Sequence, residues 1–230
     1  MTTFNTNTIE TVPGKLKIVS GNGLKRRMKQ LMLFLVSMGL ASFSGWAQIA
    51  EKPEDISPLL IGETIHDLEL KAPDAGSHKF SSIVGEKPTV LLVYRGGWCP
   101  FCNAHLSAIQ GVQAEVIRLG YQIVAVSPDS PEKLQATDAN EKLDYSLYSD
   151  ADGKFIQALG IAFKAPANYK GMLYEASGEL NDGFLPVPSV FVVDPSGKIL
   201  FEYINPDYKT RISARLLLAV LSNLDLDPQN

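Results

Sequence analysis

The sequence predicts an α/β fold in which a mixed central sheet carries helices on both faces. Short apolar runs rich in β-branched residues recur along the chain and are typical of buried strands. Stretches with apolar residues at helical spacing separate these runs, and a tight turn joins the last two of them. Buried strands that alternate with helices form a mostly parallel sheet, to which a terminal hairpin adds antiparallel strands.

The first half of the predicted fold alternates strands with a long helix. A short strand over 66–71 is followed by a turn at 73–76, where Pro, Asp and Gly gather. The run PTVLLVY at 88–94 predicts a strand that is buried on both faces. Helical spacing of apolar residues predicts a helix over 100–119, and QIVAV at 122–126 predicts a second buried strand.

The second half continues this alternation with shorter elements. Ser130 and Pro131 are the residue types that favour a helix N-cap and first turn. A short strand at 146–148 and a helix that ends at Leu159 follow. Residues 163–187 hold several glycines and prolines, so we expect an irregular insert there.

The chain closes with a hairpin and a helix. Strands at 189–193 and 198–204 flank Asp-Pro-Ser-Gly at 194–197, which is a turn sequence. Apolar residues at helical spacing predict a last helix over 210–224.

Residues 1–47 are expected to be a leader, so that the domain spans 48–230. Its core, Met28–Ala47, has a basic start, an uncharged stretch and small residues suited to signal-peptidase cleavage. Met28 is a candidate translation start. We expect an exported, periplasmic protein without stable membrane contact after cleavage. The alternative is an uncleaved anchor over Leu31–Ala47, a length near the lower limit for a bilayer span.

Removal of this leader makes the protein acidic. Residues 1–47 hold six of the 21 basic residues and one of the 25 acidic ones, which leaves a net charge of −9. An acidic chain without a basic stripe is a poor binder of nucleic acid, so we expect no nucleic-acid partner.

Cys99 and Cys102 form a C-x-x-C motif between a predicted strand and the start of a predicted helix. A disulfide that closes so small a loop adds little stability, so reactivity explains the pair better. Cys99 lies at the helix N-terminus, where free N–H groups and the helix dipole favour a thiolate. Cys99 is therefore the candidate attacking thiol, and Cys102, one turn further along, is the candidate resolving thiol.

The cysteine pair has three other interpretations. A zinc site needs about four ligands, and Cys99, Cys102 and His105 offer three, with His66 and His78 as the remaining histidines. Covalent haem attachment needs His directly after the second cysteine, where Asn103 stands. A purely structural disulfide remains an alternative. We expect no metal and no cofactor beyond the dithiol itself.

Pro188 precedes a predicted buried strand, and a proline in that position needs a reason. We expect a cis Val187–Pro188 bond that faces the cysteines and exposes the Val187 backbone for pairing with a substrate chain. The alternative is a trans proline in an irregular approach to the strand, because Pro186 is nearby.

Residues around the motif complete the candidate site. Arg95 either stabilises a thiolate or oxyanion or is a surface charge at a strand end. The candidate substrate-binding residues are Arg95, Trp98, Pro100, Phe101, Val187 and Pro188. Trp98 and Phe101 are expected to form an apolar rim around the site, and core packing is the alternative.

Several polar residues near the motif are given no role. His105 is expected to be a solvated helix residue rather than a proton donor, although histidine titrates in a useful range. No pattern distinguishes Tyr94, Glu115 or Asp129.

Five segments together resemble the peroxiredoxin-like branch of the alkyl hydroperoxide reductase/thiol-specific antioxidant superfamily. They are YRGGWCPFCNAHL, VAVSPDSPEKL, SDADGKFIQALGI, VPSVFVVDPSGKI and INPDYKTR, and the likeness covers about residues 57–224. The resemblance implies a thioredoxin-like fold. It also implies thiol-dependent reduction of hydroperoxides through Cys99 and Cys102, with a thioredoxin-like protein as electron donor.

The sequence departs from that pattern at two positions. Gly96 stands where typical peroxiredoxins have Thr or Ser three residues before the reactive cysteine, and Pro188 stands near the place of a family arginine. These departures keep a second function open, a periplasmic thiol–disulfide oxidoreductase that acts on protein disulfides. The third alternative is a binding module in which the cysteine pair is only a staple.

Overall fold

The computed structural model describes residues 49–224, so the expected leader at 1–47 lies outside the described residues. Within 49–224, no helix combines the length and the apolar character that a membrane crossing requires.

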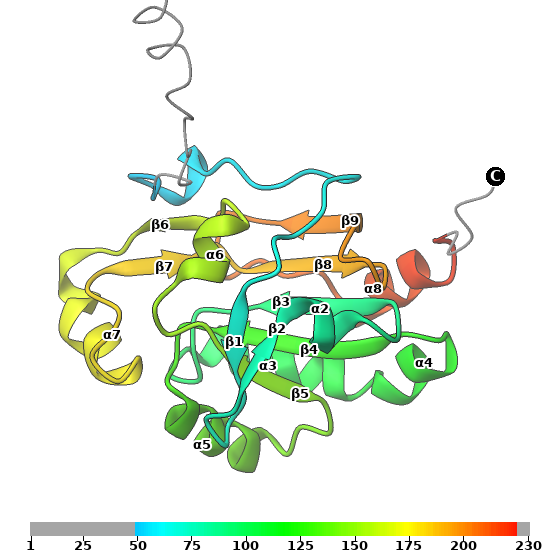
Figure 1. Ribbon diagram of the computed structural model, residues 1–230, viewed down its shortest axis with the longest axis horizontal. Helices are drawn as coiled ribbons and strands as arrows, with labels where there is room; N and C mark the ends of the chain where they lie inside the picture. The colour runs from blue at the N-terminus through cyan, green and yellow to red at the C-terminus, as the bar shows by residue number, and fades with distance from the viewer. Residues whose placement is uncertain (1–48, 225–230) are drawn as a thin grey trace, which may run out of the picture. The chain divides into compact units, whose positions relative to one another are not determined.

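One sheet of seven strands organises this part of the chain (Figure 1). Its spatial order is β2 (Ser77–Lys79), β1 (Glu69–Lys71), β5 (Ser146–Ser149), β4 (Gln122–Ser127), β3 (Thr89–Val93), β8 (Ser189–Val193) and β9 (Ile199–Ile204). Only β3–β4 and β4–β5 pair in parallel. The mixed α/β sheet is confirmed, but the expectation that it is mostly parallel is wrong, because hairpins build both of its ends.

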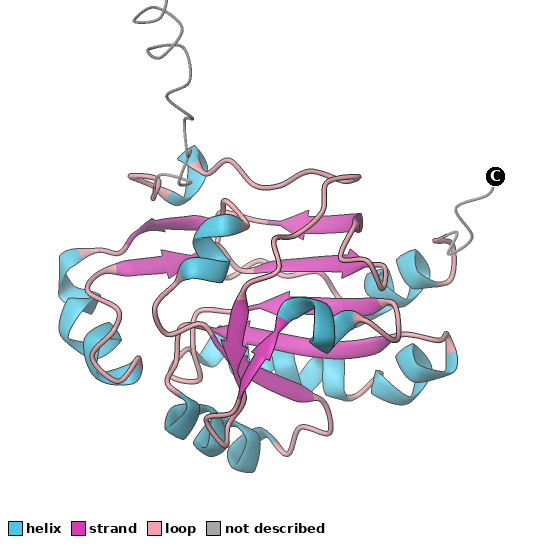
Figure 2. Cartoon of the chain, viewed as in Figure 1, coloured by secondary structure: helices cyan, strands magenta, loops and turns pink. Residues whose placement is uncertain are grey.

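Helices lie on both faces of this sheet (Figure 2). They are α2 (Phe80–Val84), α3 (Pro100–Gln110), α4 (Gln113–Arg118), α5 (Pro131–Glu141), α6 (Lys154–Ala158), α7 (Lys170–Ala176) and α8 (Ala214–Leu221), with short 3₁₀ turns η1 (Pro53–Asp55) and η2 (Ala167–Tyr169). The helix expected over 100–119 is two helices, because Val112 leaves helical geometry at ψ 8°. Ser130 is the N-cap of α5, as predicted, and its hydroxyl accepts from the Lys133 N–H.

The sheet separates two apolar cores. All five residues of β3 are buried, as the sequence predicts for a strand covered on both sides. Val90 and Leu92 point to the core beneath α3, α4 and α8, which also holds both cysteines. Leu91 and Val93 point to the opposite core, with α2 and α6. Full burial of each such side chain contributes about 1.5–3 kcal/mol, so this strand anchors both cores.

Residues 163–187 are more ordered than the sequence suggests. They include α7, most of β6 (Ala162–Lys164) and β7 (Phe184–Pro186), and β6 pairs antiparallel with β7 in a separate two-stranded sheet. The buried Asn181 amide holds the segment together, because it accepts from Gly183 and Phe184 N–H groups and donates to the Phe184 carbonyl. Pro186 is tolerated because a two-stranded sheet consists of edge strands.

Asp150 ties the end of β5 to the start of α6. Its carboxylate accepts the backbone N–H groups of Phe155 (3.0 Å) and Ile156 (2.8 Å), and the residue is 2% exposed. These N–H groups belong to the first turn of a helix, where no intrahelical partner exists.

We predict that Asp150→Ala destabilises the fold, because two buried N–H groups lose their acceptor. The expected loss is about 1–3 kcal/mol in the free energy of unfolding, measured by urea denaturation. Asp182→Ala, at an exposed position, is the control. Equal midpoints for the two variants would contradict the assigned role of Asp150.

Candidate active site

Cys99 is the N-cap of α3, and Pro100 is the first residue of that helix, as the sequence predicts. The Cys99 carbonyl accepts the N–H groups of Cys102 at 2.9 Å and Asn103 at 3.1 Å, which starts the helix. Both cysteines are free thiols, and each is 1% exposed. The cysteine sulfurs therefore lie at the positive end of a helix dipole, shielded from solvent.

The two thiols have opposite pKa shifts. The Cys102 thiol and backbone N–H donate to the Cys99 sulfur, and with the Arg95 and Arg211 charges they lower the pKa of Cys99 to about 6, against the effect of burial. The same hydrogen bond, together with burial, raises the pKa of Cys102 well above its ordinary value. At neutral pH the pair therefore holds a Cys99 thiolate and a Cys102 thiol.

Arg95 is buried, so the interpretation of it as a surface charge is wrong. The residue is 4% exposed, and its guanidinium carbon lies 4.3, 5.0 and 5.3 Å from the ring centres of Tyr208, Trp98 and Tyr169. No salt bridge to Arg95 is found within residues 49–224. Three aromatic faces thus accommodate the cation without cancelling its charge, which remains available to an anion such as the Cys99 thiolate.

Arg211 supplies a second positive charge that the sequence analysis missed. One of its terminal nitrogens lies 3.7 Å from the Cys102 sulfur. The residue belongs to the INPDYKTR segment, but more than a hundred positions separate it from the cysteines. Only the return of the chain from β9 to α8 brings it to the site.

Two glycines allow the loop before Cys99 to pack closely. Gly96 has φ +139°, and a Cβ there would lie 2.3 Å from Trp98 Nε1 and 2.7 Å from Asp129 Oδ1. A Cβ on Gly97 would lie 2.0 Å from Thr137 Oγ1. The hydroxyl-bearing residue of typical peroxiredoxins therefore does not fit at Gly96 in this loop.

The residues next to the cysteines form a partly exposed aromatic surface. Phe101 is 41% exposed and meets the Tyr208 ring edge-on at 5.6 Å. Trp98 is half-buried, packs against the α3-side core and lies 5.7 Å from the Tyr169 ring. Pro100 is exposed. Trp98 thus combines the expected rim position with core packing.

Val187 and Pro188 differ from the expectation. The described residues contain no cis peptide bond, so Val187–Pro188 is trans. Val187 is fully buried; its N–H donates to the Ile161 carbonyl, and its carbonyl accepts from the Ser189 hydroxyl. The prediction that this backbone is free to pair with a substrate chain is wrong, because the Ile161 carbonyl and the Ser189 hydroxyl already bond to it. Ser189 pairs with Val93, so Pro188 does lie beside the segment that leads to Cys99.

His105 is not the solvated residue that was expected. Its Nε2 atom is buried and has no hydrogen-bond partner in the described part of the chain. Burial and the nearby Arg211 charge lower the pKa of His105 to about 4, so the ring is neutral at physiological pH.

Asp129 and Tyr94 are the polar residues that the sequence did not single out. Asp129 is 2% exposed and accepts the Gly97 N–H at 2.7 Å and the Ser127 hydroxyl at 3.3 Å. Burial raises its pKa to about 6. Tyr94 is 3% exposed, and its hydroxyl lacks a hydrogen bond of ordinary geometry. The available signal was position, since Asp129 follows a buried strand that pairs in parallel with β3.

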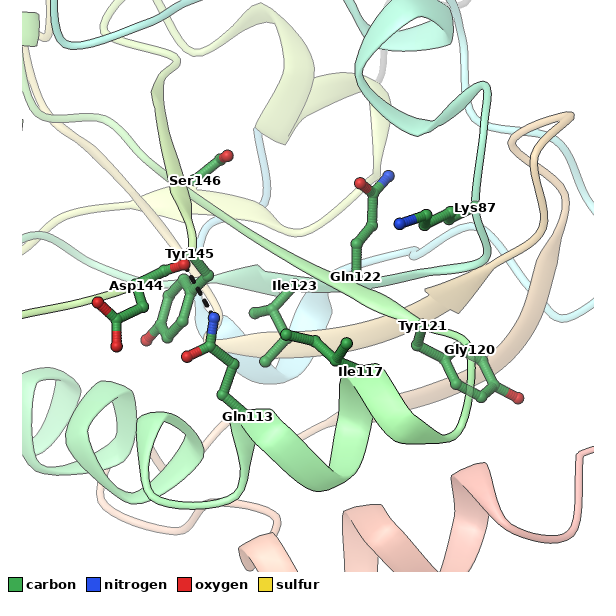
Figure 3. Close-up of a pocket in the computed structure, with 10 residues that line it drawn as sticks. All are labelled: Lys87, Gln113, Ile117, Gly120, Tyr121, Gln122, Ile123, Asp144, Tyr145 and Ser146. Atoms are coloured by element: carbon green, nitrogen blue, oxygen red, sulfur yellow. Dashed lines mark hydrogen bonds between the residues drawn. The ribbon is translucent and has the colours of Figure 1, made fainter.

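One cavity borders the loop before Cys99, and another lies far from the cysteines. A cavity of about 310 Å³ borders Gly97, Trp98 and Asp129. Another, of about 260 Å³, is lined by residues at the starts of β4 and β5, including Gln122 and Ser146 (Figure 3). Cys99 follows the C-terminal end of β3, and β3, β4 and β5 run parallel. The cavity of Figure 3 therefore lies at the N-terminal ends of these strands, away from the cysteines. In residues 49–224, no three His, Cys, Asp or Glu side chains are grouped to hold a metal ion.

We predict that Gly96→Ser disturbs the loop before Cys99 instead of improving the site. The side chain would displace Trp98 or Asp129, so we expect slower alkylation of Cys99 or a loss of about 1–3 kcal/mol in unfolding free energy. Gly171→Ser is the matched control, because nothing lies within 4 Å of a Cβ there. Wild-type stability and wild-type Cys99 reactivity in Gly96→Ser would contradict this account.

Comparison with known proteins agrees with this architecture. The sequence matches the AhpC/TSA family over residues 61–201. It is 23% identical over 155 residues to peroxiredoxin Bcp of Escherichia coli, covering 67% of this chain and 90% of Bcp. It is 24% identical over 181 residues to the thiol-disulfide oxidoreductase ResA of Oceanobacillus iheyensis, covering 76% of this chain and 81% of ResA.

A solved structure gives the same fold. Reduced Prx3 of Vibrio vulnificus, in complex with H₂O₂, superimposes with a TM-score of 0.62 at 18% identity, over 72% of this chain and 97% of Prx3. The fold class and the family resemblance drawn from the sequence are both confirmed. The chain belongs to the AhpC/TSA family and is a peroxiredoxin-like, thiol-dependent oxidoreductase with a thioredoxin-like fold.

Proposed function

We propose that this protein reduces hydroperoxides, with Cys99 as the attacking thiolate and Cys102 as the resolving thiol. The observation that carries the proposal is the Cys99 sulfur itself. It lies at the N-terminus of α3, accepts hydrogen bonds from Cys102, and is exposed to the charges of Arg95 and Arg211. A thiolate favoured in this way is the nucleophilic form of cysteine.

The proposed cycle has three balanced steps. The Cys99 thiolate attacks the terminal oxygen of ROOH, and the O–O bond breaks. Cys99 becomes a sulfenic acid, and the alkoxide takes a proton and leaves as ROH. Cys102 then attacks the Cys99 sulfur, which forms the disulfide and releases water. A donor dithiol exchanges with this disulfide, so that both cysteines return to thiols and the donor becomes a disulfide.

Two arginines support peroxide chemistry despite the departures from the family pattern. Pro188 occupies the region of the family arginine, but Arg95 and Arg211 bring positive charge to the cysteines from other segments. Guanidinium groups bind oxyanions through several fixed donors. We infer that these two residues stabilise the departing alkoxide as well as the thiolate.

A thioredoxin-like protein is the proposed electron donor. The exposed Phe101, inside the motif, and the Tyr208 ring beside it provide an apolar surface against which a partner dithiol protein can dock. We also propose that residues 1–47 export the protein, so that this donor acts in the periplasm.

Reduction of protein disulfides is the second candidate function. The similarity to ResA, which is named as a thiol-disulfide oxidoreductase, favours it, as does the exposed Phe101 inside the motif. The hydrogen bond from the Val187 N–H to the Ile161 carbonyl disfavours this function, because a substrate chain cannot pair with Val187 without breaking that bond.

We predict rapid loss of both thiols when the reduced protein meets hydrogen peroxide in a stopped-flow instrument, because the sulfenic acid formed at Cys99 condenses with Cys102. Cys102→Ser should accumulate sulfenic acid at Cys99, and Cys99→Ser should lose all reaction above the buffer control. Because the pKa of Cys99 is lowered to about 6, the rate should be constant above pH 7 and fall about tenfold per pH unit below pH 6, as the thiolate is protonated.

Arg95→Met tests the electrostatic part of this prediction. Loss of one nearby positive charge should raise the pKa of Cys99 by about one unit or more and move the pH profile to higher pH. Peroxide-dependent thiol loss no faster than that of a small free thiol would overturn the peroxidase proposal.

Insulin reduction by dithiothreitol separates the two candidate functions. A peroxidase should not accelerate it, so wild type and Cys99→Ser should give equal turbidity curves. Acceleration by wild type alone, combined with slow peroxide reaction, would establish the protein-disulfide activity instead.

A further inference from the structure

Cys102 presents a chemical problem that the cysteine pair cannot solve alone. Its thiol must lose a proton before its sulfur attacks Cys99, yet burial and the neighbouring Cys99 hold its pKa well above the ordinary value. The residue is 1% exposed, so bulk water does not take the proton directly. A buried base connected to solvent is therefore needed.

We propose that Tyr94, Ser127 and Asp129 form a buried proton path that takes the proton of Cys102 and returns it to the group that leaves Cys99. The proposal rests on the dithiol cycle described above, and it assigns a role to residues outside the C-x-x-C motif.

The register of the sheet places Tyr94 and Ser127 together. The Tyr94 N–H donates to the Val126 carbonyl at 3.0 Å, one position beyond the Val93–Val126 pair, so Tyr94 lies beside Ser127. Side chains alternate along a strand. Tyr94 follows Val90 and Leu92 on the face that carries both cysteines, and Ser127 follows Ile123 and Ala125 on that face.

Tyr94 also lies close enough to Cys102 for the charge of one to affect the other. Both residues belong to the same buried cluster, and the N–H of Arg95, the next residue after Tyr94, interacts with the Cys102 sulfur. The Tyr94 hydroxyl is buried without a hydrogen bond of ordinary geometry. An unpaired buried hydroxyl is destabilising, so its retention points to a function. A hydroxyl without a fixed partner can rotate to accept from one neighbour and donate to another, which suits it to pass a proton.

Asp129 connects the path to solvent. Its carboxylate accepts from the Ser127 hydroxyl at 3.3 Å and borders the cavity of about 310 Å³. Exposed residues line the outer part of that cavity, among them Lys133 of α5 and Glu175 of α7, which form a salt bridge at 3.2 Å. Burial brings the pKa of Asp129 to about 6, which leaves it ionised at neutral pH and able to act as a base.

The proton balance closes without another reactant. When Cys102 attacks, its proton moves through Tyr94 and Ser127 to the Asp129 carboxylate. At the same time the sulfur–sulfur bond forms, and the bond between the Cys99 sulfur and its leaving group breaks. Asp129 then returns one proton to that leaving group, which is hydroxide after peroxide reduction or a thiolate after thiol exchange. General-base assistance of this kind contributes about 10²–10⁴-fold to a rate.

The test uses the full-length reduced protein and 2,2′-dithiodipyridine, so it does not depend on peroxide activity. Attack by Cys99 releases one equivalent of thiopyridone and leaves a mixed disulfide, and attack by Cys102 on that disulfide releases the second. Cys102→Ser should give the first release only, which identifies the second release as the Cys102 step.

We expect Tyr94→Phe and Asp129→Asn to slow the second release about tenfold or more relative to the first. In wild type the second rate should rise as Asp129 ionises near pH 6; in Asp129→Asn this rise should be absent, while the Asn oxygen still accepts from Gly97. Lys133, Glu175 and Tyr94 are the titratable groups near Asp129, and Cys102 and Tyr145 are those near Tyr94. Glu175→Gln removes the only other carboxylate of residues 49–224 that lines this cavity, and it should retain the rise.

Tyr121→Phe is the matched control, because Tyr121 is a buried tyrosine of the same core whose hydroxyl contacts the Leu221 carbonyl instead. It should keep the wild-type ratio of the two rates. Equal slowing of both releases in Tyr94→Phe and Asp129→Asn would show a structural role only. Slowing in just one variant, or a retained pH rise in Asp129→Asn, would also overturn the path. A failed peroxide assay would leave this result unaffected.

Discussion

The hydrogen bond from the Gly97 N–H to the Asp129 carboxylate, at 2.7 Å, positions the loop on which the site depends. It joins the segment after β3 to the segment after β4, across the parallel pair at the centre of the sheet. The Asn103 amide holds the other side of Gly97 by donating to its carbonyl at 2.9 Å. Gly97 is thereby fixed from two elements, and Cys99 is held at the start of α3.

Positive charge without a local counter-charge governs the chemistry of this loop. A buried guanidinium is costly unless another group compensates for its lost hydration. Around Arg95 the compensation comes from the faces of Trp98, Tyr169 and Tyr208, which attract a cation but carry no net charge. A carboxylate in the same place would neutralise Arg95 and weaken its effect on the thiolate. The aromatic environment therefore preserves the positive field of Arg95, which adds to the hydrogen bonds from Cys102 in lowering the pKa of Cys99.

The segments that surround the motif come from distant parts of the chain. Tyr169 belongs to the insert at 163–187, and Tyr208 and Arg211 belong to the connection between β9 and α8. Both segments lack a strong hydrophobic period, so their composition indicates loops. These segments contribute aromatic and basic side chains that surround the cysteine pair. The central sheet and α3 hold the cysteine pair in place. Variation of these segments would alter substrate access while the cysteine geometry is kept.

The strand and helix pattern, the cysteine pair at a helix start and the family could be predicted from the sequence, because periodicity and local motifs encode them. The sequence did not reveal the order inside residues 163–187, whose Asn181 bridge depends on side-chain contacts, or the trans Val187–Pro188 bond with its occupied backbone. The burial of Arg95 and the approach of Arg211 and Asp129 were decided by tertiary structure alone. These features join residues far apart in the chain, where no local pattern records which side chains meet.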